Sequence, residues 1–242
     1  MRVFLLFLWP LFLWAETYFA RVEPLRTYTI AAETAGRVAH IDKSAEGRVA
    51  DKRPVVQLDR TLKAAELEAA QTRHANLQES YEIRKKQVER NAQIASRSRL
   101  ERENDRLGLL ELHSQLASAK ENLVRLSEAY EAAQVSAPGL FIHRILVEEG
   151  SFVAVGTPLL TAHDVSGSRL VIFVRAEALY GLEHKEIMVE GALSNYRVDK
   201  VWQSADDQQI SAYRVELTGP PPQGPFSKVV KVEFRPKEGK NP

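Results

Sequence analysis

The sequence predicts an elongated, multi-domain, mixed α/β protein. It would consist of a β-module in two halves, split by a long antiparallel α-helical coiled-coil hairpin, and a small antiparallel β-barrel after it. Three observations predict this fold class. Segments 36–59 and 139–160 carry the same order of glycines and β-branched residues. A long stretch without proline separates them, and short runs of alternating apolar and polar residues follow.

The N-terminus has the pattern of a secretory signal. Arg2 precedes an apolar run from Val3 to Trp14, which is followed by the small residue Ala15. Such a run would form a helix about 18 Å long, well short of the roughly 30 Å hydrocarbon core of a bilayer. We therefore expect residues 1–20 to be a signal peptide whose last removed residue is Ala15 or Ala20. The alternative is an uncleaved anchor that continues through Ala20, and in both cases the mature chain would work outside the cytoplasm.

The two β halves match each other at a constant offset. Gly47 corresponds to Gly150 at an offset of 103 residues, and the same offset pairs His40 with His143. Each half is short and punctuated by glycine, as expected for a few small strands with tight turns.

Neither half is large enough to bury a core alone, so we expect them to pack into one module. This module would comprise residues 28–59 and 136–165. The stretch between them must then leave and return at one place, which predicts that Asp59 and Ala137 are neighbours.

Residues 60–134 are rich in Ala, Leu, Glu, Arg, Gln and Lys, and contain one glycine and no proline. This composition predicts helix. Arms of equal length place the turn at the midpoint, near residues 95–98, where serine could cap the second helix. Gly108 is the competing position, but a turn there would make the arms very unequal.

Apolar residues in this stretch alternate steps of three and four, which is typical of a coiled-coil seam. The second arm shows the pattern most clearly: Leu109, Leu112, Leu116, Ala119, Leu123, Leu126, Tyr130 and Ala133. The first arm has a more polar seam: Leu67, Ala70, His74, Leu77, Tyr81, Arg84, Val88, Asn91 and Ala95.

The C-terminal part predicts a small β-barrel over residues 166–235. A short helix is expected at 177–183, a proline-rich loop at 219–225, and a disordered tail at 236–242. The predicted strands are 170–174, 187–189, 198–202, 213–217 and 229–234.

Composition excludes several functional classes. The formal net charge is +1, from 33 basic and 32 acidic residues, so no strong field favours nucleic acid as a partner. The absence of cysteine excludes disulfides, thiolate metal sites and cysteine nucleophiles. The six histidines have no short ligand spacing, and no Ser–His–carboxylate motif or phosphate-binding glycine loop occurs. We therefore expect no enzymatic activity, no metal and no cofactor.

Several short motifs around the predicted hairpin together resemble the periplasmic adaptor proteins, also called membrane fusion proteins, of bacterial tripartite efflux and secretion systems. The resemblance covers about residues 28–235. Its motifs are Thr34-Ala35-Gly36-Arg37-Val38 and Leu58-Asp59 before the helices, and Val135-Ser136-Ala137-Pro138-Gly139, Val147-Glu148-Glu149-Gly150 and Gly156-Thr157-Pro158-Leu159 after them.

The resemblance implies a role and a set of partners. The β halves would form a lipoyl-like β-sandwich, the hairpin would reach an outer-membrane channel, and the barrel would lie nearer an inner-membrane transporter. The chain would form a homo-oligomeric ring, as a hexamer, in the periplasm and export drugs or other small molecules. The resistance–nodulation–division type is favoured; the alternatives are an adaptor of an ABC-type or type I secretion system and a coiled-coil spacer of the envelope without a transport role.

A lipoyl-like fold also raises the question of a covalently bound cofactor. In a carrier domain the modified lysine lies on the turn between the two halves, and here the coiled coil replaces that turn. Lys43 precedes the Glu46-Gly47 turn instead. We therefore expect no lipoylation or biotinylation.

At the hairpin tip, Arg84, Val88 and Ser96 resemble the channel-contact triplet of resistance–nodulation–division adaptors. The spacing from Val88 to Ser96 is one residue longer than in that pattern, and valine replaces leucine. The alternative for Arg84 is an ion pair across the hairpin with Glu101 or Glu103.

Overall fold

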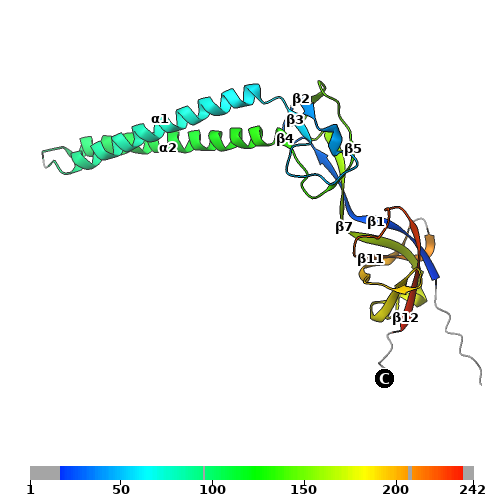
Figure 1. Cartoon of the computed structure of the whole chain (residues 1–242). Coiled ribbons are helices and arrows are strands. Elements are labelled where there is room, and N and C mark those ends of the chain that lie inside the picture. The colour runs from blue at the N-terminus through cyan, green and yellow to red at the C-terminus, as the bar shows by residue number, and fades with distance from the viewer. Residues whose placement is uncertain (1–16, 95, 207–208, 237–242) are drawn as a thin grey trace, which may run out of the picture. The chain divides into compact units, whose positions relative to one another are not determined.

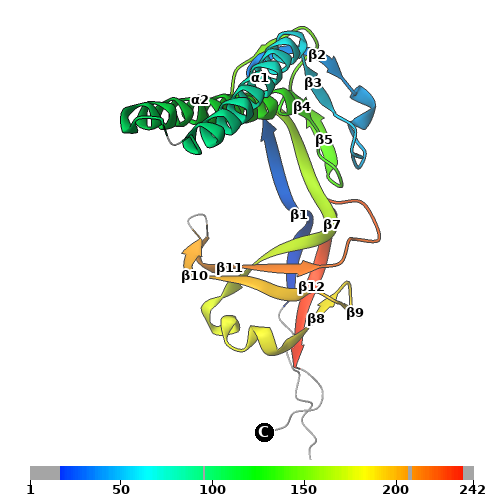
Figure 2. The same cartoon turned by 90° about the vertical axis from the view of Figure 1, so that its left-hand side faces the viewer.

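The computed structural model describes residues 17–94, 96–206 and 209–236, and the chain divides into two compact units. Of the described residues, those within 28–162 form one unit, and those within 17–27 and 163–236 form the other. Two long helices and antiparallel sheets confirm the mixed α/β class (Figures 1 and 2). Within the described ranges, no helix combines the length and the apolar character needed to cross a membrane.

The helical hairpin belongs to the unit 28–162. Helix α1 (Thr61–Ala92) and helix α2 (Arg99–Glu131) lie side by side and antiparallel (Figure 1). The connection at 93–98 contains the predicted turn at 95–98, of which Ala95 lies outside the described residues. Gly108 lies within α2 and is tolerated there, because a glycine inside a helix costs only about 1 kcal/mol.

Polar side chains mark where each helix begins. The Oγ of Ser98 accepts a hydrogen bond from the Glu101 amide at 3.3 Å, and the Glu101 carboxylate accepts one from the Ser98 amide at 2.8 Å. This capping box satisfies amides that a helix start leaves without partners. At the other helix, Asp59 accepts hydrogen bonds from the Thr61 amide at 2.9 Å and the Thr61 hydroxyl at 2.8 Å.

The β strands of this unit come from both sides of the hairpin. Strands β2 (Gly36–Ile41), β3 (Val56–Leu58), β4 (Gln134–Val135) and β6 (Phe152–Val153) form an antiparallel sheet in the order β4-β3-β2-β6. Strand β5 (Phe141–Ile145) pairs with β7.

The two ends of the hairpin meet in this sheet. Val56 pairs with Val135, and the Leu58 amide donates to the Ala133 carbonyl at 2.8 Å. The shared core contains Val38, Ile41, Val55, Val56, Leu58, Val135, Ile142, Val153, Leu159 and Leu160.

The two halves are related by a pseudo-twofold pattern of hydrogen bonds. The Val38 amide donates to the Ser151 carbonyl, and the Ile142 amide donates to the Arg48 carbonyl, both at 2.8 Å. The Gly150 amide reaches the Val38 carbonyl at 2.8 Å, and the Gly47 amide reaches the Ile142 carbonyl at 2.9 Å. Both glycines have positive φ, 78° at Gly47 and 85° at Gly150, which explains glycine at the two turns.

This pattern corrects the predicted pairing of His40 with His143. Because Val38 corresponds to Ile142, His40 corresponds to Arg144. The offset between the halves is 103 residues at the turns, where Gly47 corresponds to Gly150. In the strands it is one residue longer, because Val38 corresponds to Ile142. The extra residue of the first half lies just after β2, where the chain forms the short 3-10 helix η1 (Lys43–Ala45).

The second unit is built on the sheet order β10-β11-β7-β1-β12-β8-β9. Strands β1 and β7 run from one unit into the other (Figure 2). Its elements are β1 (Thr17–Ala31), β7 (Pro158–Arg175), the 3-10 helices η2 (Ala176–Leu179) and η3 (Leu182–His184), β8 (Lys185–Val189), β9 (Ala192–Leu193), β10 (Arg197–Asp206), β11 (Gln209–Gly219) and β12 (Val229–Pro236).

Alternating residues of these strands form the core of the second unit. The strands predicted at 170–174, 187–189, 198–202, 213–217 and 229–234 lie within β7, β8, β10, β11 and β12. The core contains Ala20, Val22, Leu170, Ile172, Val174, Leu182, Ile187, Val215, Leu217, Val230, Val232 and Phe234. The helix predicted at 177–183 is divided between η2 and η3 by Gly181, whose φ is 70°.

Strand β1 was not predicted from the sequence. Residues 17–20 were assigned to the signal peptide, but Thr17 pairs with Glu233 of β12, and Ala20, only 2% exposed, lies in the core. Strand β1 lies between β7 and β12 in the sheet. Its partner residues in β12 are more than two hundred positions away in the chain, so the local sequence carries no signal of that pairing. Most of the predicted signal peptide (1–16) and of the predicted tail (237–242) lies outside the described residues.

Candidate functional site

The end of the hairpin opposite the β strands is strongly basic. Between residues 84 and 106 it has eight basic and four acidic side chains. The basic residues are Arg84, Lys85, Lys86, Arg90, Arg97, Arg99, Arg102 and Arg106, and the acidic ones are Glu89, Glu101, Glu103 and Asp105. We call this segment the basic tip.

Asp105 is the centre of a polar cluster within the basic tip. Its carboxylate accepts hydrogen bonds from Arg84 at 3.0 Å, from Asn91 at 2.9 Å, and from Arg97. The Asp105 side chain is only 14% exposed. The hydrogen bond from Asn91, and then the positive charges of Arg97 and Arg84, hold the pKa of Asp105 below its usual value. The cluster joins α1, the connection and α2.

Two of the remaining three acidic residues also have partners within the tip. Glu101 belongs to the capping box of Ser98, and Glu103 pairs with Arg99 at 3.0 Å.

Five cations of the tip form no ion pair with any other described residue: Lys85, Lys86, Arg90, Arg102 and Arg106. All five are exposed. The tip therefore offers positive charge to a partner, while most of its carboxylates stabilise its own structure.

The three residues of the predicted channel-contact triplet lie in different environments. Arg84 and Val88 are half-buried in the seam between the helices, whereas Ser96 is exposed in the connection. The predicted ion pair of Arg84 with Glu101 or Glu103 is wrong, because Arg84 pairs with Asp105. Asp105 lies one turn further along α2 from Glu101, a difference that depends on the helix register.

The seam residues Leu109, Leu112, Leu116, Leu123, Leu126 and Tyr130 are all half-buried on α2. At the root, the Arg60 guanidinium lies 4.4 Å from the centroid of the Tyr130 ring. Halfway along, the rings of Tyr81 and His113 are 5.6 Å apart. These contacts hold the two helices at a defined register.

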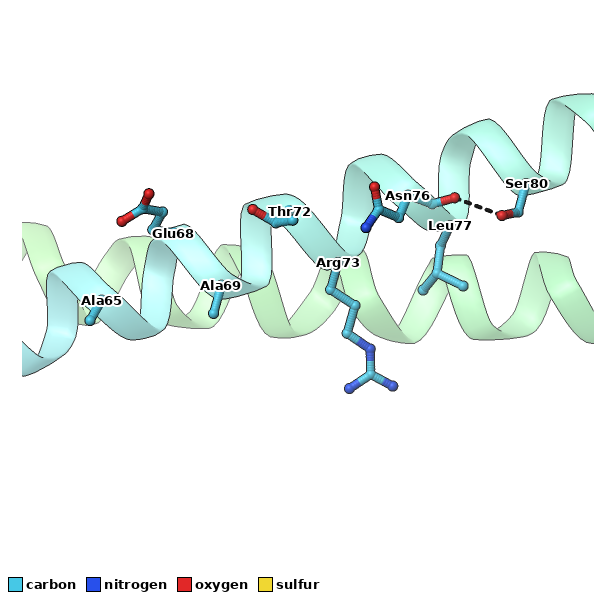
Figure 3. A pocket seen from close by; sticks show the side chains of 8 residues that line it. All are labelled: Ala65, Glu68, Ala69, Thr72, Arg73, Asn76, Leu77 and Ser80. Carbon is cyan, nitrogen blue, oxygen red and sulfur yellow. Dashed lines mark hydrogen bonds between the residues drawn. The ribbon is translucent and has the colours of Figure 1, made fainter.

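The outward faces of the hairpin carry apolar residues that do not belong to the predicted seam. Leu107, Leu110 and Val124 on α2 and Ile83 on α1 are exposed. A shallow groove runs along α1 and is lined by Ala65, Glu68, Ala69, Thr72, Arg73, Asn76, Leu77 and Ser80 (Figure 3). The sequence signal for the α2 face is weak, because Ser114 and Glu121 interrupt the three-and-four steps that lead from Leu107 and Leu110 to Val124.

A charged network crosses the sheet of the other unit. Glu216, only 5% exposed, pairs with Arg214 at 2.7 Å and lies 3.6 Å from Arg169. Arg169 also pairs with Glu23 at 2.9 Å, and Arg214 lies 4.8 Å from the Trp202 ring centroid. The network joins strands β1, β7, β11 and β10, and so supports the sheet. Nothing in the local sequence predicts it.

Searches by sequence found no relative: no protein-family model matches, and no curated protein matches.

Comparison with solved structures found the same fold repeatedly. The membrane fusion protein Spr0693 from Streptococcus pneumoniae R6 matches with a TM-score of 0.69 at 10% identity, over 92% of this chain and 99% of that one. A chimera of MacA with the α-hairpin domain of Pseudomonas aeruginosa MexA gives 0.65 at 12% identity, over 91% and 80%. A candidate efflux transporter from Bacteroides eggerthii DSM 20697 gives 0.63 at 16%, over 93% and 69%.

These matches cover the hairpin together with both units, because each spans more than nine-tenths of this chain. They confirm, at the level of the fold, the resemblance recognised in the sequence motifs. This chain has the fold of the membrane fusion, or periplasmic adaptor, proteins.

Proposed function

We propose that this protein is the periplasmic adaptor of a tripartite efflux pump, joining an inner-membrane transporter to an outer-membrane channel. One observation carries the proposal: a β-module assembled from two remote segments projects a helical hairpin that ends in a basic tip. Such a molecule can connect partners across a distance and needs no catalytic group to do so. We therefore infer a non-enzymatic role.

Each part of the hairpin supports this role physically. Paired strands on both sides of the root fix where the hairpin leaves the module. The helices α1 and α2 would each span about 50 Å at 1.5 Å per residue, enough to bridge a considerable gap. The half-buried seam stiffens the two helices into a single rod.

The basic tip is the proposed contact with the channel. Ser96 and the five exposed cations would touch the partner, because they are available for contact. Arg84, through Asp105, would keep the tip in its docking conformation. Val88 would pack under the tip from the seam.

The two β regions and the N-terminal segment have proposed roles as well. The β strands within 28–162 would form the lipoyl-like domain. The strands from 166 to 235, completed by residues 17–27, would form the β-barrel near a transporter of the resistance–nodulation–division or ABC type. A cleaved signal peptide would deliver the chain to the periplasm, where it would form a homo-oligomeric ring at the inner membrane.

Two measurements test this function. Deleting the gene should lower resistance to dyes, detergents and antibiotics several-fold, and the intact gene should restore it. A photoreactive residue at position 96 should cross-link to an outer-membrane protein in cells. The same residue at position 72, on the shaft of the hairpin, should not. Unchanged resistance and unchanged protein export in the deletion strain, with no outer-membrane cross-link from position 96, would contradict the proposal.

A further inference from the structure

The helical hairpin is joined to the β-module, that is, to the strands within 28–162, by two short connections. Residues 59–60 lead from β3 into α1, and residues 132–133 lead from α2 into β4. The Asp59 amide donates to the Arg37 carbonyl at 2.8 Å, so the first connection is held to the module through the backbone. The connections determine where the hairpin leaves the module. Two adjacent points of attachment, however, still allow it to tilt about the line between them.

Packing does little to prevent such a tilt. Of the described residues, those that build the apolar core of the β-module all lie outside α1 and α2. Neither helix packs broadly against a described strand of the module. The first turn of α1 is largely exposed, and the side chain of Leu62 there is 71% exposed. A polar side-chain contact at the root can therefore decide the direction of the hairpin.

Lys63 makes such a contact from the first turn of α1. Its ammonium donates a hydrogen bond to the Ala35 carbonyl at 2.9 Å. Ala35 comes just before β2 and 28 positions before Lys63, so the bond joins α1 to a separate part of the module. The next residue is Gly36, where an added Cβ would already touch the Lys63 Nζ at 3.7 Å. A larger side chain at this position would crowd the ammonium.

The segment that accepts this hydrogen bond is itself held in place. Ala32 is only 2% exposed, and its amide donates to the Thr157 carbonyl at 2.9 Å. The Ala32 carbonyl accepts a hydrogen bond from the Gly156 amide at 2.8 Å. Because Ala32 lies close to Ala35 in the chain, Lys63 is bound to a fixed point of the module.

The Lys63 ammonium is also placed favourably with respect to charge. Asp59 lies one helical turn before it, at the start of the helix. Hydrogen bonds from Thr61, and then the positive charges of Lys63 and Arg37, hold the pKa of Asp59 below its usual value. The ammonium is therefore attracted by Asp59 while it donates its hydrogen bond to the module.

We propose that Lys63 is a positioning residue, whose hydrogen bond to Ala35 fixes the direction in which the hairpin projects from the β-module. This inference rests on the proposed adaptor function and names the residue that directs the basic tip toward its channel. Direction matters because the hairpin is a long lever. With arms of about 50 Å, a tilt of about 10° moves the tip by about 9 Å, far more than the reach of a hydrogen bond.

Distances between spin labels test the proposal on the purified full-length chain, which has no natural cysteine. Labels on cysteines at the exposed positions 52 and 96 report how the tip lies relative to the module. With Lys63 present we expect one narrow distribution of distances. Lys63→Met should raise the share of distances outside it about fivefold, the effect of losing one hydrogen bond of ordinary net strength.

Two further variants control this measurement. Lys63→Arg keeps the charge and the hydrogen-bond donors, and should retain the narrow distribution. Lys120→Met is the matched control, because Lys120 is exposed on α2 and forms no ion pair with another described residue. A distribution that is unchanged in Lys63→Met, or that broadens equally in Lys120→Met, would overturn the proposal.

Urea unfolding separates positioning from a general effect on stability. The Lys63 contact lies outside the seam, so Lys63→Met should shift the unfolding midpoint of the helical signal less than Leu116→Ala does. Broadened distances with a nearly unchanged midpoint support the positioning role. A midpoint that falls as far as in Leu116→Ala would show that Lys63 stabilises the hairpin itself, and would overturn the proposal.

A measurement in cells distinguishes failure of this inference from failure of the adaptor function. Lys63→Met should lower the yield of the cross-link from position 96 to the outer-membrane protein several-fold, and Lys63→Arg should restore it. Equal yields in the wild type and Lys63→Met would overturn the role of Lys63 and leave the adaptor function intact. If the wild type itself gives no cross-link, the adaptor function fails, and the label distances still decide whether Lys63 fixes the direction of the hairpin.

Discussion

The Arg84 guanidinium of α1 donates a hydrogen bond to the Asp105 carboxylate of α2, with 3.0 Å between Nη2 and Oδ1. The same carboxylate also accepts hydrogen bonds from Asn91 and from Arg97 of the connection. One acidic side chain therefore holds three segments of the tip together. The proposed docking surface therefore depends on this cluster as well as on the exposed cations of the basic tip.

Asp105→Asn should loosen the tip without unfolding the hairpin. The amide cannot accept two charged donors as the carboxylate does, and charge-assisted hydrogen bonds are stronger than neutral ones. We expect backbone amides at 84–105 to exchange with deuterium several-fold faster, while the root remains protected. Glu103→Gln is the control: it breaks only an exposed pair within α2 and should leave exchange unchanged. Equal exchange in the two variants would contradict this role of Asp105.

The stability of the tip should depend on pH only in acid. The pKa of Asp105 is lower in the folded chain than in the unfolded one, chiefly through Asn91 and then through Arg97 and Arg84. Its contribution is therefore complete above the unfolded pKa, and is lost as pH falls through the folded pKa. We expect constant protection of the tip from neutral pH to about pH 5 and a decline below about pH 4.

Hydrogen exchange of the wild type and of Asp105→Asn across this range checks the pH prediction. The variant should lose part of the acid-dependent decline. It should keep the part due to Glu101, whose pKa is also lowered by its hydrogen bonds to Ser98. A decline that begins near neutral pH would point to another group.

Ser98→Ala should lower the free energy of unfolding of the hairpin by about 1 kcal/mol, because the capping box at the start of α2 is lost. Urea unfolding followed by far-ultraviolet circular dichroism measures this, since α1 and α2 provide nearly all the helical signal. Ser96→Ala is the matched control. Ser96 is exposed in the connection, so its removal should spare stability and impair channel contact instead. Equal stability of the two variants would argue against the cap.

Leu116→Ala should destabilise the hairpin by roughly 1–2 kcal/mol, because a half-buried leucine leaves the seam. Leu110→Ala removes the same atoms from the outward face and should change the unfolding free energy of the monomer by less than about 0.5 kcal/mol. A larger loss in Leu110→Ala than in Leu116→Ala would mean that the seam is misassigned.

We expect export to remove the proposed signal peptide after Ala15, not after Ala20. Cleavage after Ala20 would take a core residue and the pairing of Thr17 to Ala20 with β12 away from the sheet. The intact mass of the protein recovered from the periplasm distinguishes the two products. Finding the shorter product in a folded, active protein would show that the start of β1 is dispensable.

Much of the hairpin could be predicted because helical patterns are local. The seam residues Leu112, Leu116 and Leu123 are half-buried as their spacing indicates. The turn position followed from equal arm lengths alone. The partner of Arg84 could not be predicted, because Glu101, Glu103 and Asp105 lie within one turn of helix. Which of the three it meets depends on the exact helix register.

The sequence alone determined the order of parts: two matching β halves, a hairpin between them, and a strand-rich region after it. Short-range periodicity and glycine turns carry that information. Only the tertiary structure decided which strands pair and in which register. In the structure Thr17 pairs with Glu233, and the Val38 amide donates a hydrogen bond to the Ser151 carbonyl. The strands of the two halves correspond with an offset that differs by one residue from the offset at the turns. Pairing between strands depends on contacts across long stretches of chain, and no local pattern records the choice of partner.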